Sequence, residues 1–182
     1  SGEKFIYAYY DGVDKIAHER GFGSFYEAEL ASADGIVRKI QETLTPGAVL
    51  IVTADHGQVM VGTNTMPPHP EVMAMVAYQS GEGRFRWLHA RDGVQVELLA
   101  RATAHHSGVA WVASKEQVID ENWLGPRLGS ATRKRLGDVV LVPREPISFD
   151  DAADTGPFIL QCRHGALTDD ELDVPLLATA VQ

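Results

Sequence analysis

Five side chains in this sequence have the right types and spacing to bind divalent metal ions, and they occur in three short segments. The first segment supplies Asp14 and His18, four residues apart. The second, T-A-D-H-G, supplies Asp55 and His56, and the third, C-R-H-G, supplies His164. Carboxylate oxygens and imidazole nitrogens are the ligands that zinc takes in the absence of thiolates. The residue types therefore predict a metal site.

Each of these segments follows an apolar run that is typical of a buried strand, at residues 5–10, 48–54 and 157–162. A helix is expected between the first two runs, because Ser24 and Glu27 have the spacing of a capping box. A strand, a helix and a second strand in this order predict a crossover with parallel strands. The carboxyl ends of parallel strands share one sheet edge, so we expect the metal-binding side chains to converge there.

The rest of the chain predicts an α/β fold, with a mostly parallel sheet and helices on both of its faces. We expect residues 1–79 and 146–182 to form the metal-binding core, and residues 80–145 to form a small α/β insert. Further strands are predicted at 72–78, 85–89, 109–113 and 138–142, and helices at 92–104, after Ser114 and after Thr168. Ser114 with Gln117, and Thr168 with Glu171, have capping-box spacing.

The composition excludes several classes of protein. With 182 residues, 45% of them hydrophobic, the chain can build a core. Its formal net charge of −9 argues against binding to duplex nucleic acid, which requires a basic surface. Its apolar runs are shorter than the ~20 residues of a membrane span, so no membrane partner is expected. The single Cys162 excludes an intrachain disulfide and fits a reducing, cytoplasmic compartment.

The remaining histidines have ordinary explanations. His105 and His106 end a predicted helix, where a cation suits the helix dipole. His69 lies in a proline-rich loop, and His89 alternates with apolar neighbours as a packed strand residue does. Asp11 is expected to orient a metal ligand rather than to bind the ion itself. None of the serines and threonines lies in a recognisable activated setting, so no catalytic nucleophile is assigned within this chain.

Three motifs together resemble a known family: Y-x-x-x-D-x-x-x-H from Tyr10 to His18, T-A-D-H-G, and R-H-G-A-L-T-D-D-E-L-D-V-P-L. This combination is similar to the alkaline phosphatase superfamily, in its type I phosphodiesterase/nucleotide pyrophosphatase branch. The resemblance implies two divalent metal ions, zinc in the first place, with manganese as the alternative. By motif match, one ion would be held by Asp14, His18 and His164, and the other by Asp55 and His56.

The resemblance also implies which parts of the enzyme lie elsewhere. In the family, a Thr or Ser nucleophile and a further Asp ligand come from the amino-terminal half of the fold, and neither motif is found here. The chain is therefore expected to be a carboxy-terminal portion of an alkaline-phosphatase-like core, inactive alone and partnered by the missing half. The implied reaction is hydrolysis of a phosphodiester, pyrophosphate or phosphomonoester bond through a covalent intermediate, on a small phosphate ester or nucleotide.

Two alternatives stay open at this point. The same scaffold could carry a sulfatase or a phosphoglycerate-mutase-type enzyme, and a sulfatase would need a C/S-x-P-x-R motif that Cys162-Arg163-His164 does not match. A metal-binding or interaction module without catalysis belongs to a different class. Metal binding with no turnover in the full-length protein would favour that module.

Overall fold

The computed structural model describes residues 4–154, 156 and 159–181. Its helices are α1 (Gly12–Arg20), α2 (Ser24–Thr43), α3 (Pro70–Met73), α4 (Gln95–His106), α5 (Lys115–Asp120), α6 (Ser130–Arg133) and α7 (Asp169–Leu172). Its strands are β1 (Val49–Thr53), β2 (Val59–Met60), β3 (Thr65–Met66), β4 (Val76–Glu82), β5 (Phe85–Ala90), β6 (Ala110–Ser114), β7 (Val139–Pro143), β8 (Ser148–Phe149), β9 (Cys162–Arg163) and β10 (Leu176–Ala180). The prediction of an α/β fold is confirmed.

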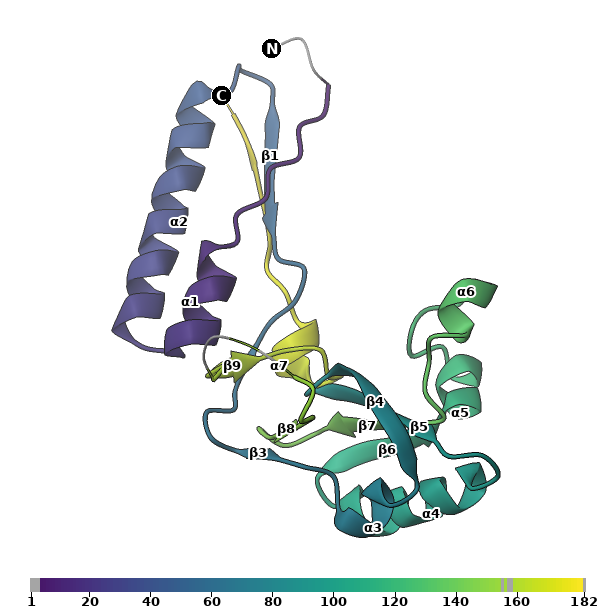
Figure 1. Ribbon diagram of the computed structural model, residues 1–182. Helices are drawn as coiled ribbons and strands as arrows, with labels where there is room; N and C mark the ends of the chain where they lie inside the picture. Colours follow the sequence, from purple (N-terminus) through teal and green to yellow (C-terminus); the bar gives the residue numbers. More distant parts are fainter. Residues whose placement is uncertain (1–3, 155, 157–158, 182) are drawn as a thin grey trace.

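Figure 1 shows two lobes that meet near β9 and α7. The elongated lobe contains α1, α2, β1 and β10, and the compact lobe contains the four-stranded sheet with α3, α4 and α5 around it. The elements of the elongated lobe come from the two ends of the chain. The predicted metal-binding residues lie on α1 and on the loops that follow β1 and β9.

The strand pairing differs from the expected mostly parallel sheet. β1 pairs with β10 in antiparallel fashion, from Val49 opposite Ala180 to Thr53 opposite Leu176. Within the described part of the chain, β3 and β8 form the one parallel pair. Residues 5–10 form no strand, and the side chains of Phe5 and Tyr7 are 82% and 76% exposed. A strand forms only where a neighbour takes up its backbone hydrogen bonds, and this run has no such neighbour among the described residues.

The compact lobe has a well-packed core on both faces of its sheet. The strand order is β4-β5-β7-β6, and all three pairings are antiparallel. Side chains alternate between faces along a strand, so Val139 and Leu141 of β7 pack toward α4, while Val140 and Val142 pack toward α5. Ala166, two residues after His164, packs in the second of these clusters. The insert thus supports the loop that carries a predicted metal ligand.

The boundaries of several elements differ from the sequence predictions. The residues after the first apolar run form α1 rather than a loop, and the N-cap of α2 is Gly23 rather than Ser24. Glu27 donates its backbone N–H to the carbonyl of Gly23, and no side chain caps this helix. The strand expected at 72–78 begins only at Val76, because α3 takes up the preceding residues. In contrast, the predicted cap of α5 is confirmed: the Ser114 hydroxyl accepts the Gln117 N–H at 3.1 Å.

The last predicted strand, at 157–162, lies partly outside the described residues, which exclude 157 and 158. Pairing begins at Cys162, with β9 antiparallel to β2. The capping box predicted at Thr168 is replaced by a contact between side chains, because the Thr168 hydroxyl donates to the Glu171 carboxylate. The carboxylate belongs to α7, which lies where the two lobes meet.

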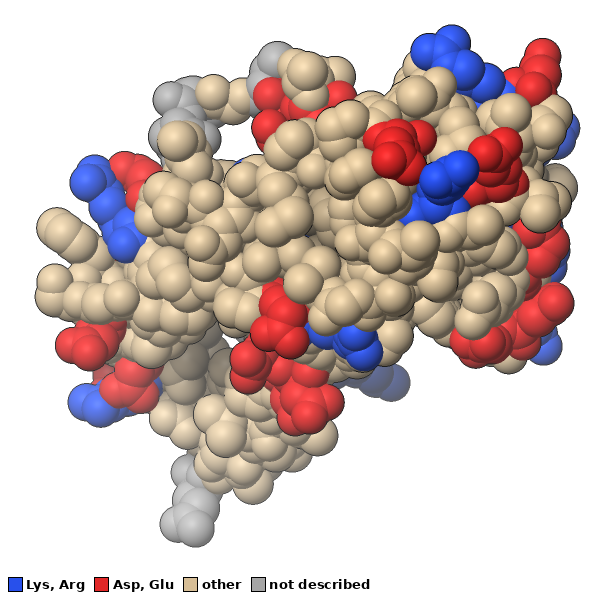
Figure 2. Space-filling view, turned by 90° about the horizontal axis from the view of Figure 1, so that it is seen from below, with Lys and Arg blue, Asp and Glu red and all other residues tan. Residues whose placement is uncertain are grey.

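The surface shows small groups of opposite charge. On the face in Figure 2, Lys and Arg side chains lie singly or in small groups among carboxylates. This face offers no continuous basic stripe of the kind that duplex nucleic acid requires. In the part of the chain that the structure describes, none of the helices has the length and apolar character needed to cross a bilayer.

Candidate metal centre

Helix α1 places Asp14 and His18 on one face, because residues four apart lie one turn above each other. The Oδ1 atom of Asp14 lies 3.2 Å from Nε2 of His18 and 3.9 Å from Nε2 of His164. One potential ligand atom from each of these three residues lies within 4.8 Å of the other two. A carboxylate and two imidazoles at this separation fit the donor set of a zinc ion that keeps one position open.

The main chain of β9 orients the ring of His18. Its Nδ1 atom lies 2.7 Å from the carbonyl oxygen of Cys162 and donates a hydrogen bond to it. This bond leaves the lone pair on Nε2, the atom that faces Asp14. The thiol of Cys162 is buried, which raises its pKa to about 11. Cys162 therefore contributes a backbone carbonyl to the site rather than a thiolate ligand.

His56 joins the centre from the loop after β1. Its ring stacks on His164 with centroids 3.6 Å apart and an angle of 15° between the planes. Its Nδ1 donates to the carbonyl of Gly57 at 2.9 Å, and its Nε2 lies 3.7 Å from Oδ1 of Asp55. The side chain of Asp55 is 63% exposed, more than any other member of the group. The structure thus brings all five predicted residues to one place, with Asp55 on its open side.

The protonation of His164 favours ligand binding. Burial lowers the pKa of His164, and the neighbouring His56 and His18 lower it further, against the opposing effect of Asp14. A histidine with a pKa below its usual value is neutral at pH 7, as a metal ligand must be. Ion binding at this centre is consequently not expected to release a proton from most His164 rings at neutral pH.

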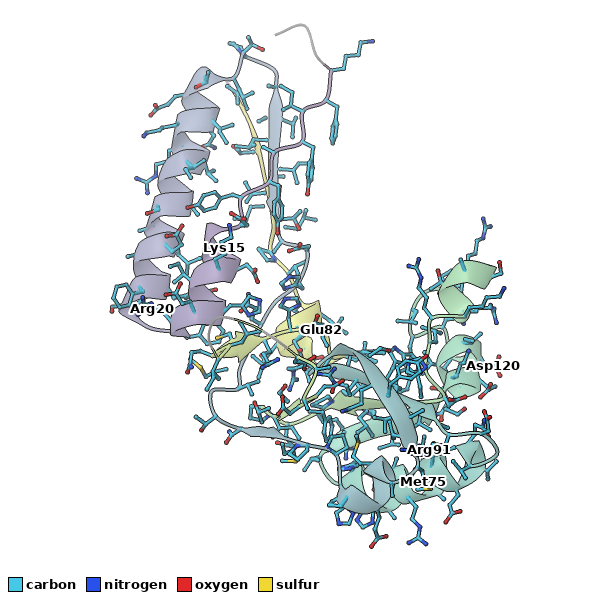
Figure 3. The ribbon with its side chains drawn as sticks, in the orientation of Figure 1. Lys15, Arg20, Met75, Glu82, Arg91 and Asp120 are labelled. Carbon is cyan, nitrogen blue, oxygen red and sulfur yellow. The ribbon has the colours of Figure 1, made fainter. Side chains whose placement is uncertain are left out.

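The residue that orients a metal ligand is Gln58 rather than the predicted Asp11. Asp11 forms an ion pair with Lys15, which Figure 3 labels on α1, at 2.6 Å. No hydrogen bond or ion pair joins Asp11 to the five predicted residues in the described structure. Instead, Gln58 donates its side-chain N–H to Asp14 and holds that carboxylate in place. The only sequence signal for Gln58 was its position directly after the D-H-G motif.

A second group of potential ligands lies in the compact lobe. His69, Glu71 and His105 each offer an atom within 4.8 Å of the others. The protein's own groups already satisfy them: Arg101 pairs with Glu71 at 3.0 Å, and Nδ1 of His69 accepts the Glu71 N–H. Neighbouring His106 is buried, which lowers its pKa to about 4. We therefore assign no ion to this group. The sequence analysis likewise explained His69 as a loop residue and His105 as a residue at a helix end.

Gly57 packs tightly against the carboxy-terminal motif. A Cβ atom at this position would lie 2.0 Å from the backbone oxygen of Asp170. The Gly57 N–H also donates to the carbonyl of Glu171 at 2.8 Å. Only glycine allows the loop that carries His56 to approach α7 this closely.

The variant Gly57→Ala is therefore expected to push this loop away from α7. We expect it to lower the free energy of unfolding by roughly 1–3 kcal/mol, the usual effect of overpacking, and to weaken zinc binding. Urea unfolding and a zinc competition titration would measure both effects. Gly35→Ala is the matched control, because nothing lies within 4 Å of its Cβ position in α2; that helix substitution is expected to stabilise the protein slightly. Equal stability and zinc affinity of both variants would contradict the prediction.

Comparison with known proteins places this geometry in context. A family model described as type I phosphodiesterase/nucleotide pyrophosphatase matches residues 3–166. No curated protein sequence matches the chain. Human ectonucleotide pyrophosphatase/phosphodiesterase 5 is similar in structure, with a TM-score of 0.60 and 17% identity over 91% of this chain and 44% of its own.

Phosphonoacetate hydrolase from Sinorhizobium meliloti 1021, in complex with phosphonoacetate, gives a TM-score of 0.59 and 22% identity over 91% of this chain and 43% of its own. An inactive form of the murine ectonucleotide pyrophosphatase/phosphodiesterase 5, in complex with AMP, gives a TM-score of 0.58 and 16% identity over 91% of this chain and 44% of its own. At these identities the likeness shows a shared fold. The chain spans less than half the length of the structures it matches.

Proposed function

Because the chain belongs to the type I phosphodiesterase/nucleotide pyrophosphatase family of the alkaline phosphatase superfamily, we propose that it supplies the carboxy-terminal metal ligands of a two-metal hydrolase. The proposal rests chiefly on the convergence of Asp14, His18 and His164 within 4.8 Å. These three residues would hold one ion, zinc in the first place, and Asp55 and His56 would hold the second. The substrate would be a phosphodiester, pyrophosphate or phosphomonoester.

Two bound ions would supply charge stabilisation for the attacking and leaving oxygens of an in-line displacement. The residues of this chain prepare the site for that chemistry. Gln58 fixes the carboxylate of Asp14, and the Cys162 carbonyl fixes the ring of His18 with Nε2 toward the centre. The depressed pKa of His164 keeps its ring unprotonated at neutral pH. The protein thereby offers oriented donors before an ion arrives.

A cavity of about 270 Å³ beside the metal ligands could admit part of a substrate. It is lined by His18, Glu82, Gly83, Leu160, Arg163 and His164. Figure 3 labels Glu82 at the end of β4, where the two lobes meet. The Arg163 guanidinium provides a cation that suits an anionic ester, and Glu82 lines the same cavity with the opposite charge. A small phosphate ester or nucleotide is the substrate class that we propose for this space.

We further propose that the rest of the family fold completes the site. The exposed strands favour such a partner: Ile51 of β1 and Leu176 of β10 are 60% and 75% exposed, and a two-stranded ribbon is marginally stable alone. A nucleophilic Thr or Ser and a further Asp would come from the missing half. Residues 1–79 and 146–182 would then belong to the core, and residues 80–145 to an insert.

The test uses the full-length protein with zinc, an aryl phosphodiester, an aryl phosphomonoester and an aryl sulfate. We expect hydrolysis of a phosphate ester, loss of turnover after chelation, and recovery when zinc or manganese is added back. Hydrolysis of the sulfate ester alone would indicate a sulfatase. Zinc binding without turnover of any ester would indicate a non-catalytic metal-binding module, and both results would overturn the proposal.

A further inference from the structure

We propose that Arg84 and Glu171 form a positioning pair that sets the distance between the two sets of metal ligands. This inference rests on the proposed function. It concerns residues that contact no proposed metal ligand side chain directly. Glu171 lies in α7, and Arg84 lies in the turn between β4 and β5, so the pair also joins the compact lobe to the metal centre.

Glu171 holds both loops that carry the stacked histidines. Its backbone carbonyl accepts the N–H of Gly57, the residue after His56, at 2.8 Å. Its side-chain Oε1 accepts the N–H of Ala166, two residues after His164, at 2.9 Å. One residue thus fixes the two main-chain segments whose rings stack at 3.6 Å. A shift of Glu171 would move one loop relative to the other.

Arg84 fixes the carboxylate of Glu171 in turn. Its Nε donates to Oε1 at 2.8 Å, and its Nη2 donates to Oε2 at 2.6 Å, a bidentate arrangement. The remaining N–H groups donate to the carbonyls of Pro143, Glu145 and Ile147. All five donors of the guanidinium are therefore used, and the two side chains are 0% and 1% exposed. This network leaves the carboxylate a single orientation.

A buried ion pair of this kind is weak evidence for a role in stability. Replacing such a pair by apolar residues of similar size is often neutral or stabilising, because desolvation offsets the attraction. Burial alone would raise the pKa of Glu171, but the hydrogen bonds from Arg84, Thr168 and Ala166 outweigh it and the pKa is lowered. Glu171 is therefore a carboxylate at neutral pH, with an oxygen directed at the Ala166 N–H. A geometric role explains this arrangement better than a stabilising one.

The experiment compares two double variants of the full-length protein, in which both charges of the pair are removed. Arg84→Met with Glu171→Leu removes the acceptor of the Ala166 N–H, whereas Arg84→Met with Glu171→Gln keeps an acceptor oxygen. We expect zinc affinity to fall about 10–100-fold in the first, the usual effect of losing an outer partner of a ligand, and to fall less in the second. A competition titration with a chromophoric chelator measures the affinity, and thermal unfolding confirms that each variant is folded.

Leu141→Ala provides the control for a purely structural effect, because Leu141 is fully buried in the sheet core on the face packed toward α4. We expect this variant to lose stability while its zinc affinity stays that of the wild type. If the leucine double variant does not fold, the zinc affinity of Arg84→Lys tests the inference instead. This variant keeps the positive charge but loses the bidentate fork. Wild-type zinc affinity in the folded double variant, or in Arg84→Lys, would overturn the inference.

The proposed function is tested separately in the same titration. If the wild-type protein binds zinc and His164→Ala does not change the binding, the assignment of the metal ligands fails. If His164→Ala weakens binding and the Arg84 and Glu171 variants do not, only the positioning role fails. The two failures are therefore distinguishable.

Discussion

Replacing His164 by alanine is expected to remove one equivalent of zinc from the full-length protein and to lower its esterase activity by more than about 100-fold, the upper end for an outer-shell partner. The reason is geometric. His164 lies opposite Asp14 in the proposed three-residue ligand set and stacks on His56, so its loss affects both sets. Elemental analysis after gel filtration would measure the zinc content, and hydrolysis of an aryl phosphodiester would measure the activity.

His105→Ala is the matched control for this experiment. It removes a histidine from the second group of potential ligands, where Glu71 is already paired with Arg101. We expect zinc content and turnover to stay unchanged in this variant. An unchanged zinc content in His164→Ala would refute the assignment, and a zinc equivalent lost from His105→Ala would show that the second group binds an ion.

The second large effect concerns the 182-residue chain alone, which we expect to show no turnover of an aryl phosphodiester even when saturated with zinc. In the described structure no Ser or Thr hydroxyl forms a hydrogen bond with any of the five proposed ligands, so none of these side chains activates a hydroxyl directly. Without an activated hydroxyl, the covalent step has no attacking atom. A protein that also contains the proposed amino-terminal half of the fold is expected to be active under the same conditions.

Circular dichroism and zinc titration of the isolated chain would establish that it is folded and loaded before the assay. Measurable hydrolysis that disappears in the variant Asp55→Ala would contradict the prediction, since it would locate a complete active site within these residues. Hydrolysis that survives Asp55→Ala would point to a contaminating esterase, and the assay would be repeated on repurified chain until it gives one of the other two results.

The candidate site was predictable because it depends on residue types that follow apolar runs. The runs before Asp55 and His164 were visible in the sequence, and the capping residues of α5 were visible as well. The elements that bring these side chains together differ from the predicted ones. Asp14 and His18 lie on a helix, and the neighbour of β1 is the antiparallel β10 rather than a parallel strand at 5–10. Residue types therefore predicted the convergence of these side chains better than the expected strand pairing did.

The supporting residues could not be predicted from the sequence. Gln58 and Arg84 act through long-range contacts, with Asp14 44 residues and Glu171 87 residues away in the sequence, and no local periodicity reports such contacts. The Thr168 and Glu171 pair had the spacing of a capping box, yet the carboxylate turns toward a buried guanidinium. Burial makes that charge pairing more important than the local cap, because an unpaired buried arginine would be costly.

The stacking of His56 on His164 would affect how ions fill the two proposed ligand sets. Rings in face-to-face contact at 3.6 Å cannot turn independently, so a ring that rotates to meet one ion also changes the orientation available to the other. Occupancy at one position is then thermodynamically linked to occupancy at its neighbour, and the linkage must be equal in both directions. Either ion could bind first. The coupling free energy between the two positions would be the same for both orders of binding.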